Sequence, residues 1–280
     1  MVSLRFLSSF YILILFSSCA PKSILLDYPK IVSIYFEKKI SSLEKNNSAD
    51  IEDRRQLLKT RVEYSYGVIM EENDRLIDHD YSKALQGYKK ANLLFNESKI
   101  LGKEILNEKY PKFEEWLNNK LLIEFEKDDA FELYWLAAAM GGSIKSSRGN
   151  PFELIHLPQV KKLLSTAISI DSTWGNGALY SAMLSYTASR TDLSAEVLRD
   201  SANYYFNEAI VISDSLDASP FLTYAESLNR PFQEKEEFED KLNFILTMDT
   251  KRSSNFELGN LIAKKRAKWL LSKTDEYFIE

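Results

Sequence analysis

Residues 133–142 read Leu-Tyr-Trp-Leu-Ala-Ala-Ala-Met-Gly-Gly, an apolar run in which small side chains are frequent. Ala139 of this run is followed by Ala182 and Ala225 in two later stretches of similar pattern, and each step is 43 residues long. Two equal steps indicate an internal repeat, and the spacing of the apolar positions around each alanine indicates helices. The run therefore predicts a series of similar helix pairs.

The three stretches have the pattern of tetratricopeptide (TPR) repeats, helix–turn–helix units in which small residues fix the helix contacts and large apolar residues fill the gaps. The first helices are marked by Trp135, Ala138, Ala139 and Gly142, by Ala178, Ser181, Ala182 and Ser185, and by Phe221, Tyr224, Ala225 and Leu228. The second helices are marked by Val160, Leu164 and Ala167, by Ala202, Phe206 and Ala209, and by Phe238, Leu242 and Ile245. One further second helix, earlier in the chain, is marked by Ala84, Tyr88 and Ala91.

Because a single helical hairpin cannot bury its apolar face, the hairpins are expected to stack into a solenoid with a concave surface. We therefore predict an all-α fold, an α-solenoid of TPR-like helical hairpins over residues 56–280 with a C-terminal capping helix. Gly141 and Gly142 are predicted to lie in a loop. The insertion over residues 143–158 is longer than a repeat needs and is expected to be functional. The apolar face of the capping helix is formed by Leu258, Leu261, Ile262, Lys265 and Trp269.

Cys19 is the only cysteine, and it follows an apolar run over residues 6–16 and two serines. A positive charge, an apolar stretch and small residues in this order are typical of a bacterial secretory signal. The run is too short for a membrane-spanning helix, which needs about 20 apolar residues. We expect that residues 1–18 are removed and that Cys19 receives a diacylglycerol. The alternative is ordinary cleavage that leaves a free thiol.

Several acyl chains on Cys19 would anchor the mature protein almost permanently, because each buried methylene adds about 0.8 kcal/mol of membrane affinity. The chain is then expected on the periplasmic side of the envelope, with residues 19–55 as a lipidated lead-in and tether. Ala20 stands where an aspartate often retains lipoproteins at the inner membrane in some bacteria. This residue favours the outer membrane.

Composition excludes several classes of function. The formal net charge is −5, and it becomes −6 once Arg5 is removed with the signal, so the clustered cations that bind nucleic acid are not expected. His79 and His156 lie far apart and Cys19 is expected to be acylated, so a zinc site is not expected. A cation at Asp78-His79-Asp80 is the alternative, but polar residues are ordinary between helices. Neither a phosphate-binding loop nor a nucleophile elbow occurs in the sequence. We predict that the protein is not an enzyme and has no cofactor.

Residues 133–141 resemble the TatT family, periplasmic lipoproteins associated with TRAP transporters and built on TPR-like repeats. The resemblance covers most of the mature chain and is looser over the first hundred residues. Met140 and Gly142 depart from the bulkier or aromatic residues expected at these positions. The further matching stretches are residues 157–160, 167–171, 176–178, 219–227 and 260–271.

The resemblance implies an accessory protein that docks the periplasmic solute-binding protein of a TRAP system, a secondary transporter driven by an ion gradient. It also implies a homotrimer in which the repeat domain of each subunit has a pore facing the ligand cleft of one binding protein. A small organic acid or a more hydrophobic ligand would pass between the two proteins.

Six residues are candidates for lining this pore or contacting the ligand, and repeat packing and helix capping are their alternative roles. Lys265 or Arg266 is suited to meet a carboxylate. Two other functions stay open. The first is an envelope scaffold that binds proteins without a small-molecule ligand, and the second is an enzyme whose site is assembled from dispersed carboxylates. The six candidates are Tyr134, Trp135, Met140, Lys265, Arg266 and Trp269.

Overall fold

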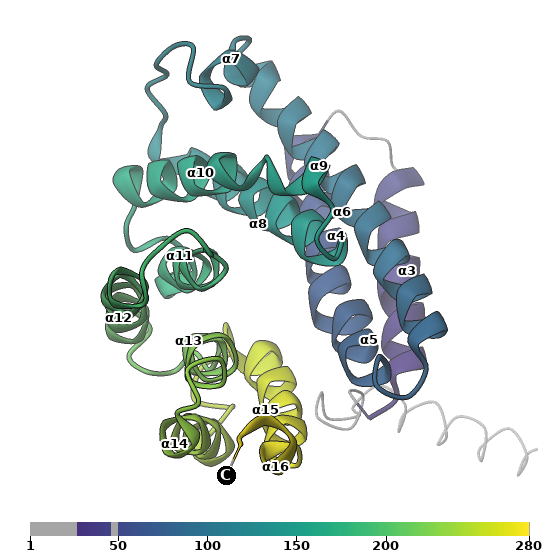
Figure 1. Ribbon diagram of the computed structural model, residues 1–280. Helices are drawn as coiled ribbons and strands as arrows, with labels where there is room; N and C mark the ends of the chain where they lie inside the picture. Colours follow the sequence, from purple (N-terminus) through teal and green to yellow (C-terminus); the bar gives the residue numbers. More distant parts are fainter. Residues whose placement is uncertain (1–26, 46–49, 280) are drawn as a thin grey trace, which may run out of the picture.

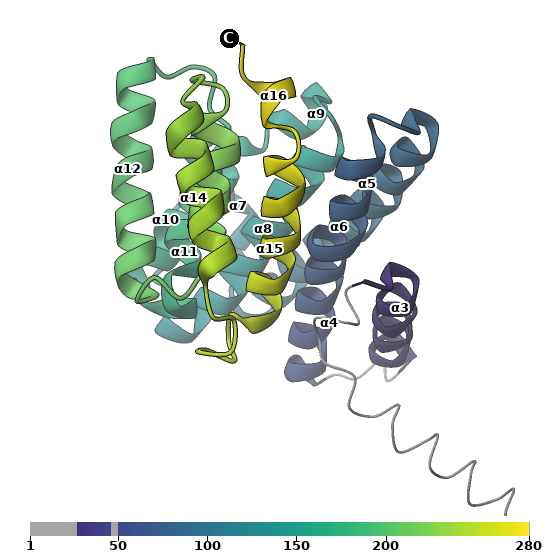
Figure 2. The same ribbon diagram turned by 90° about the horizontal axis from the view of Figure 1, so that it is seen from below.

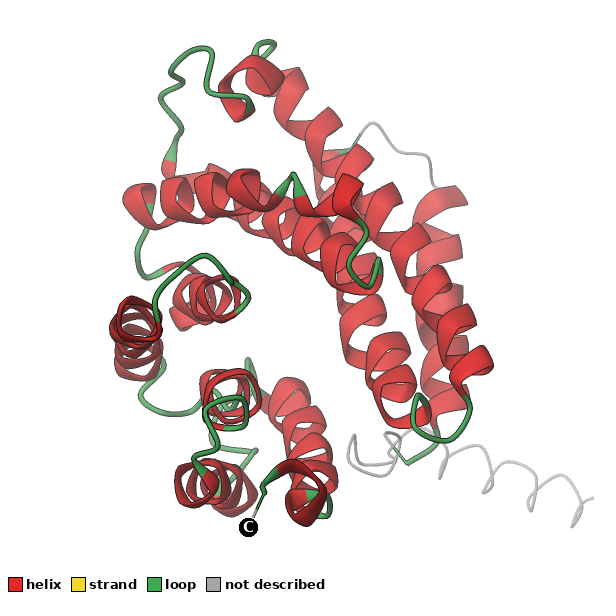
Figure 3. Ribbon diagram, in the orientation of Figure 1, coloured by secondary structure: helices red, strands yellow, loops and turns green. Residues whose placement is uncertain are grey.

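The computed structural model describes residues 27–45 and 50–279, and every regular element in these ranges is a helix or a helical turn. The predicted all-α fold is therefore confirmed (Figure 3). The α-helices are α3 (Pro29–Lys45), α4 (Ile51–Tyr64), α5 (Glu71–Leu76), α6 (Tyr81–Lys109), α7 (Phe113–Leu117), α8 (Ala130–Ser146), α9 (Pro151–Leu154), α10 (Leu157–Ile170), α11 (Ala178–Ala188), α12 (Ala195–Ile212), α13 (Ser219–Tyr224), α14 (Lys235–Thr247), α15 (Glu257–Leu271) and α16 (Thr274–Tyr277).

Four helical turns of other types connect or extend these helices. Two are 3₁₀ turns, η2 (Lys127–Asp129) and η3 (Trp174–Gly177). The other two are π turns, η1 (Ser65–Met70), which joins α4 to α5, and η4 (Ala225–Asn229), which extends α13. A π turn accommodates one extra residue within a continuous helix.

The helices pack as pairs in chain order. The continuous helix α4–η1–α5 packs on α6, α8 packs on α10, α11 packs on α12, and α13–η4 packs on α14. Helix α15 follows against α13 and α14. Figure 1 shows that α8, α11, α13 and α15 lie on the inner side of a strongly curved row, whereas α10, α12 and α14 lie outside it.

The two ends of this row meet. Figure 1 shows α15 beside the α4–α5 end of the molecule, and Arg266 of α15 forms an ion pair with Glu71 of α5. Figure 2, seen from below, shows α12, α14 and α15 running side by side, with α9 and α16 at the same end. The helix pairs thus form a ring rather than an open arc.

Local sequence explains several helix starts. The side chain of Asp80 accepts a hydrogen bond from the backbone N–H of Lys83 at 3.0 Å, and so caps α6. Ser194 caps α12 in the same way. Asn150 caps α9, where Pro151 occupies the first helical position and has no N–H to satisfy.

The three repeated alanines lie in different environments. Ala139 is fully buried between the first helix pairs, and Ala225 is fully buried in the C-terminal core. Ala182 is only half-buried, because it faces the inside of the ring. The equal spacing in sequence therefore places the three alanines on the inner elements α8, α11 and η4, but not in the same environment.

The prediction of a loop at Gly141 and Gly142 is wrong, because both residues lie within α8. A Cβ atom at Gly142 would overlap the aromatic ring of Phe95, which is fully buried on α6. The glycine therefore permits the close approach of α6 and α8, which also explains why no bulky residue occurs here. Met140, the other departure from the family pattern, is buried in the hydrophobic core.

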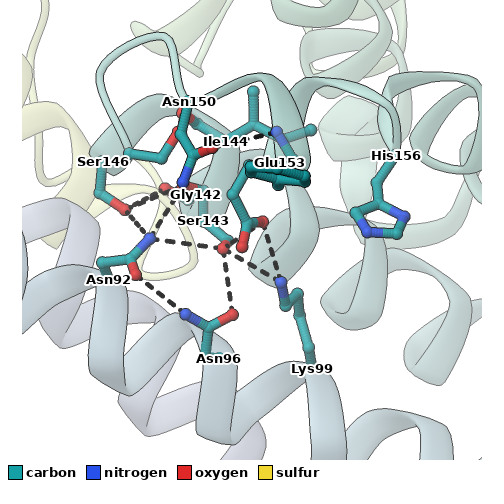
Figure 4. A network of polar contacts seen from close by, with 12 residues as sticks. Asn92, Asn96, Lys99, Gly142, Ser143, Ile144, Ser146, Asn150, Glu153 and His156 are labelled. Atoms are coloured by element: carbon teal, nitrogen blue, oxygen red, sulfur yellow. Dashed lines mark hydrogen bonds and ion pairs between the residues drawn. The ribbon is translucent and has the colours of Figure 1, made fainter.

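Within the insertion over residues 143–158, a polar network holds the short helix α9 against α6 and α8 (Figure 4). Ser143 donates a hydrogen bond to the Glu153 carboxylate at 2.7 Å, and Lys99 pairs with the same carboxylate at 3.0 Å. These two partners outweigh the effect of burial and lower the pKa of Glu153. Figure 4 shows His156 pointing away from this network.

We predict that Gly142→Ala lowers the free energy of unfolding by about 1–3 kcal/mol, because the added methyl group forces the Phe95 ring or α8 to move. The matched control is Gly259→Ala, in an exposed part of α15 where a Cβ meets nothing within 4 Å. This control should raise the free energy of unfolding by up to about 1 kcal/mol, since alanine favours helix more than glycine does. Urea unfolding followed by circular dichroism measures both values. Equal effects of the two substitutions would show that the α6–α8 contact is not tight.

Candidate functional site

The ring encloses a cavity of about 810 Å³. Its walls come from the inner helices α8, α11 and α13–η4, from three residues of α10, and from η1, α5 and α15 where the ring closes. A cavity of this size falls within the range of small-molecule sites in proteins. It is the principal candidate site of the described chain.

Small side chains keep the middle of the ring open. On α11, Ser181, Ala182 and Ser185 line the cavity, together with Ser189 just after the helix. The three serines are spaced by four residues, which places them on one helical face. Ala137, Ala138 and Gly141 of the neighbouring helix α8 also line the cavity. The α11 wall therefore offers hydroxyl groups, whereas the α8 wall is largely apolar.

Two tyrosines complete the α8 side of the cavity. The hydroxyl group of Tyr66, from η1, donates a hydrogen bond to the backbone carbonyl of Ala138 at 3.1 Å. The Tyr134 ring packs against the rings of Trp135 and Trp174. Burial raises the pKa of both tyrosines well above the usual value, so both hydroxyl groups remain neutral hydrogen-bonding groups.

Asp217 places a buried carboxyl group at the wall of the cavity, with 7% of the residue exposed. It accepts a hydrogen bond from the backbone N–H of Ser219 at 2.8 Å, and the Ser181 hydroxyl lies 3.5 Å away. Burial raises the pKa of this carboxyl group despite these donors. Its loop is held by Asn260 of α15, which bonds the carbonyl of Leu216 and the N–H of Ala218.

Arg266 lies at the junction that closes the ring, and only 6% of its side chain is exposed. Its guanidinium pairs with Glu71 at 2.8 Å and with Asp74 at 3.0 Å, both from α5. It also binds both carboxylate oxygens of Glu226 from η4, one of them at 2.7 Å from Nε. Burial by itself lowers the pKa of Arg266, but the three carboxylates, with Glu226 first, raise it above the usual value. The guanidinium is therefore permanently charged.

A second cavity of about 570 Å³ lies on the other side of this junction. Its lining includes Trp269, whose ring lies 5.6 Å from the Arg266 guanidinium. Glu226, Arg230 and Arg266 line both cavities. The ion-pair junction therefore stands between the two spaces.

The six residues predicted for a pore or ligand site separate into two groups. Tyr134 and Arg266 line the large cavity, and Trp269 lines the second one. The other three line neither of these two cavities. Trp135 packs in the core against α4, Met140 is buried with 2% exposure, and Lys265 pairs with Asp27 at 2.8 Å. Cys19 lies outside the described residues.

The sequence did not identify Tyr66, Asp217 or Glu226 as parts of a site. Ser181 and Ser185 were assigned to repeat packing. Because they lie on one helical face, the sequence could have indicated that both line a cavity. Asp217 lies in a loop before a proline, where an acidic residue is ordinary. No local pattern indicated that Glu226 would meet a guanidinium from α15.

Within residues 27–45 and 50–279, no group of three or more His, Cys, Asp or Glu side chains is arranged to hold a metal ion. In the same ranges, no helix has the length and apolar character needed to cross a membrane.

Comparison with known families gives a match over most of the chain. The family model described as TRAP transporter T-component, TAtT, matches residues 38–278. This range includes every residue placed above in the large cavity and in the ion-pair junction. No curated protein matches the sequence.

We predict that Arg266→Met lowers the free energy of unfolding by about 3–5 kcal/mol, because three carboxylates lose their buried counterion. The matched control is Arg199→Met. Arg199 pairs only with Glu234, is 37% exposed, and also lies over an aromatic ring. Loss of this half-exposed pair should cost about 0–1 kcal/mol. Urea unfolding of both variants tests the difference, and equal losses would contradict a special role for the junction.

Asp217 should make the protein less stable as pH rises. Its pKa is 3.8 in the usual case and higher in the folded protein, so the folded state loses its proton less readily than the unfolded state. Asp217→Asn should therefore raise the free energy of unfolding at pH 7. The gain should shrink towards zero as pH falls below the usual value, where both states hold the proton. Unfolding of both proteins across this pH range is the measurement, and a pH-independent gain would contradict it.

Proposed function

The chain belongs to the TRAP transporter T-component family, and we propose that it docks the periplasmic solute-binding protein of a TRAP system and passes a small ligand through the ring. The match confirms the family resemblance given by the sequence. The family is an accessory component of a transporter and is not a known class of enzyme. The observation that carries the proposal is the closed ring around a cavity of ligand size.

The walls of the cavity favour a ligand with an uncharged body. The α8 side is apolar at Ala137, Ala138 and Gly141, and the α11 wall offers serine hydroxyl groups that can donate and accept hydrogen bonds. Asp217 adds a buried acceptor at one position. A small organic compound with a mainly apolar body and a few polar groups would satisfy both walls. This is consistent with either a hydrophobic ligand or an organic acid.

The structure changes the assignment of the residue that would meet a carboxylate. Arg266 binds three carboxylates of the protein itself, so its positive charge is already balanced without a ligand anion. Lys265, the other candidate, lies away from both cavities. Lys145 and Arg230 line the large cavity and are the cations that an acidic ligand would meet there.

The insertion is the surface that we assign to the binding protein. Helix α9 is held rigidly by the network in Figure 4, yet Phe152 and Ile155 remain 78% and 68% exposed. Leu157, at the end of the same insertion, lines the large cavity. A partner docked on α9 would therefore lie near the cavity, as transfer of a ligand requires.

Anchoring and assembly remain proposals from the sequence. Membership of a transporter family indicates an envelope-associated protein. We propose that Cys19 carries the lipid, that the protein faces the periplasm, and that it is held at the outer membrane. A homotrimer, with one binding protein for each subunit, is proposed on the same basis.

One observation favours the alternative function, a protein-binding scaffold without a small-molecule ligand. Val197, Tyr204 and Val211 are spaced by seven residues on α12 and are 49%, 54% and 75% exposed. This spacing places them along one outer face of the helix. Such a stripe is suited to bind another protein independently of the cavity.

The two functions are separated by two substitutions in the tagged full-length protein, captured from native envelopes. Ser185→Trp fills the cavity from an exposed position of its wall. It should abolish retention of small molecules, measured by mass spectrometry of an extract, and leave capture of the solute-binding protein unchanged. Leu122→Trp, at a residue 93% exposed and outside the cavities, is the control and should change neither.

The scaffold function makes the opposite prediction. Tyr204→Asp would then remove the captured partners, whereas Ser185→Trp would change nothing. Absence of a periplasmic solute-binding protein among the partners of the folded wild type would reject the transport function.

A further inference from the structure

Helix α3 has apolar residues on two opposite faces. The inner face packs on α4 through Phe36 and Ile40, which are 8% and 7% exposed, and the Phe36 ring stacks on Tyr64 at a centroid distance of 5.2 Å. The outer face also carries large apolar side chains. They are Tyr28, just before the helix, and Ile31, Ile34 and Tyr35, which are 55%, 51%, 51% and 61% exposed.

This outer patch is confined to the first two turns of α3. The outward positions further along the helix are polar and exposed, among them Lys38, Ser42 and Lys45. A surface helix in water normally has one apolar face, so a second one at a helix end indicates a second contact. Lys30 and Lys38 are exposed beside the patch and add positive charge to it.

The position of α3 in the chain indicates what that contact is. Tyr28 is the ninth residue after Cys19, the predicted lipid attachment site. A chain of this length spans at most about 30 Å even when fully extended. Asp27 pairs with Lys265 of α15 at 2.8 Å, which fixes the start of this segment on the folded body. Among the residues that the structure describes, the patch is therefore the exposed apolar surface nearest to the predicted anchor along the chain.

We propose that Tyr28, Ile31, Ile34 and Tyr35 rest on the bilayer surface at the level of the lipid head groups. Amphipathic helices that bind membranes in this way present large apolar side chains flanked by lysine or arginine. Tyrosine is enriched at the membrane–water boundary because its ring is apolar and its hydroxyl is polar. Figure 2 shows α3 on the far side of α4 from α11–α14, so this contact leaves those helices free.

A second copy of the chain is a poorer occupant of this patch. A stable protein interface buries about 800 Å² on each partner. Four half-exposed side chains of this size offer roughly 400 Å². The exposed lysines beside the patch would also face each other across a symmetric contact, whereas anionic lipid attracts them.

The test uses full-length acylated protein in vesicles of phosphatidylethanolamine and phosphatidylglycerol. Cys19 is the only cysteine, so after acylation an introduced cysteine is the single reactive thiol. An environment-sensitive fluorophore is attached at Ile34→Cys or Tyr35→Cys in the patch. Ser42→Cys, exposed on the outer side of the same helix beyond the patch, is the matched control.

We expect a several-fold rise in fluorescence at both patch positions upon reconstitution, with quenching by nitroxide lipid, and no change at Ser42→Cys. Equal signals at all three positions would overturn the proposal. So would a rise at the patch that depends on protein concentration without vesicles, since this indicates a second copy. An intact mass without a diacylglycerol would overturn it as well, because the anchor that brings α3 to the membrane would be missing. None of these outcomes bears on capture of the solute-binding protein.

Discussion

The ion-pair junction at Arg266 is the constraint on which the ring depends. A row of helical hairpins ordinarily has two free ends. Here a guanidinium from the last long helix binds carboxylates from α5 and η4, so both ends are fixed to one group. Burial of these charges is costly, and only a complete set of partners offsets it. The junction therefore tolerates one geometry, and that geometry sets the width of the enclosed space.

The cavity follows from closure combined with small side chains. Once the ring is closed, the size of the side chains on the inner helices decides whether they fill its middle. Alanine, glycine and serine on α8 and α11 leave it empty. The same residue types allow close helix contacts elsewhere, as Gly142 does against Phe95. Small residues thus have two effects in this fold, and the neighbouring helix decides which one applies.

This double role explains what the sequence predicted and what it did not. The helix pairs follow from local periodicity, so the all-α class and the family were recognised from residues 133–141 and the repeated alanines. The prediction of a loop at Gly142 was wrong, because the sequence alone does not distinguish a glycine that permits close helix packing from one that ends a helix. Arg266 was expected to meet a ligand. Its internal partners Glu71 and Glu226 could not be foreseen, because they lie 195 and 40 residues away in sequence. Asp217 was missed because its burial depends on Asn260 of another helix.

The two π turns carry a consequence for how such a chain can change. Glu71, which binds Nη1 of Arg266, directly follows η1. Glu226, which binds Nε of Arg266, lies within η4. Loss of the extra residue in a π turn would rotate the rest of its helix by about 100°. The length of these two segments is therefore as constrained as their composition, and relatives that retain the closed ring should differ there by exchange of residues and not by insertion or deletion.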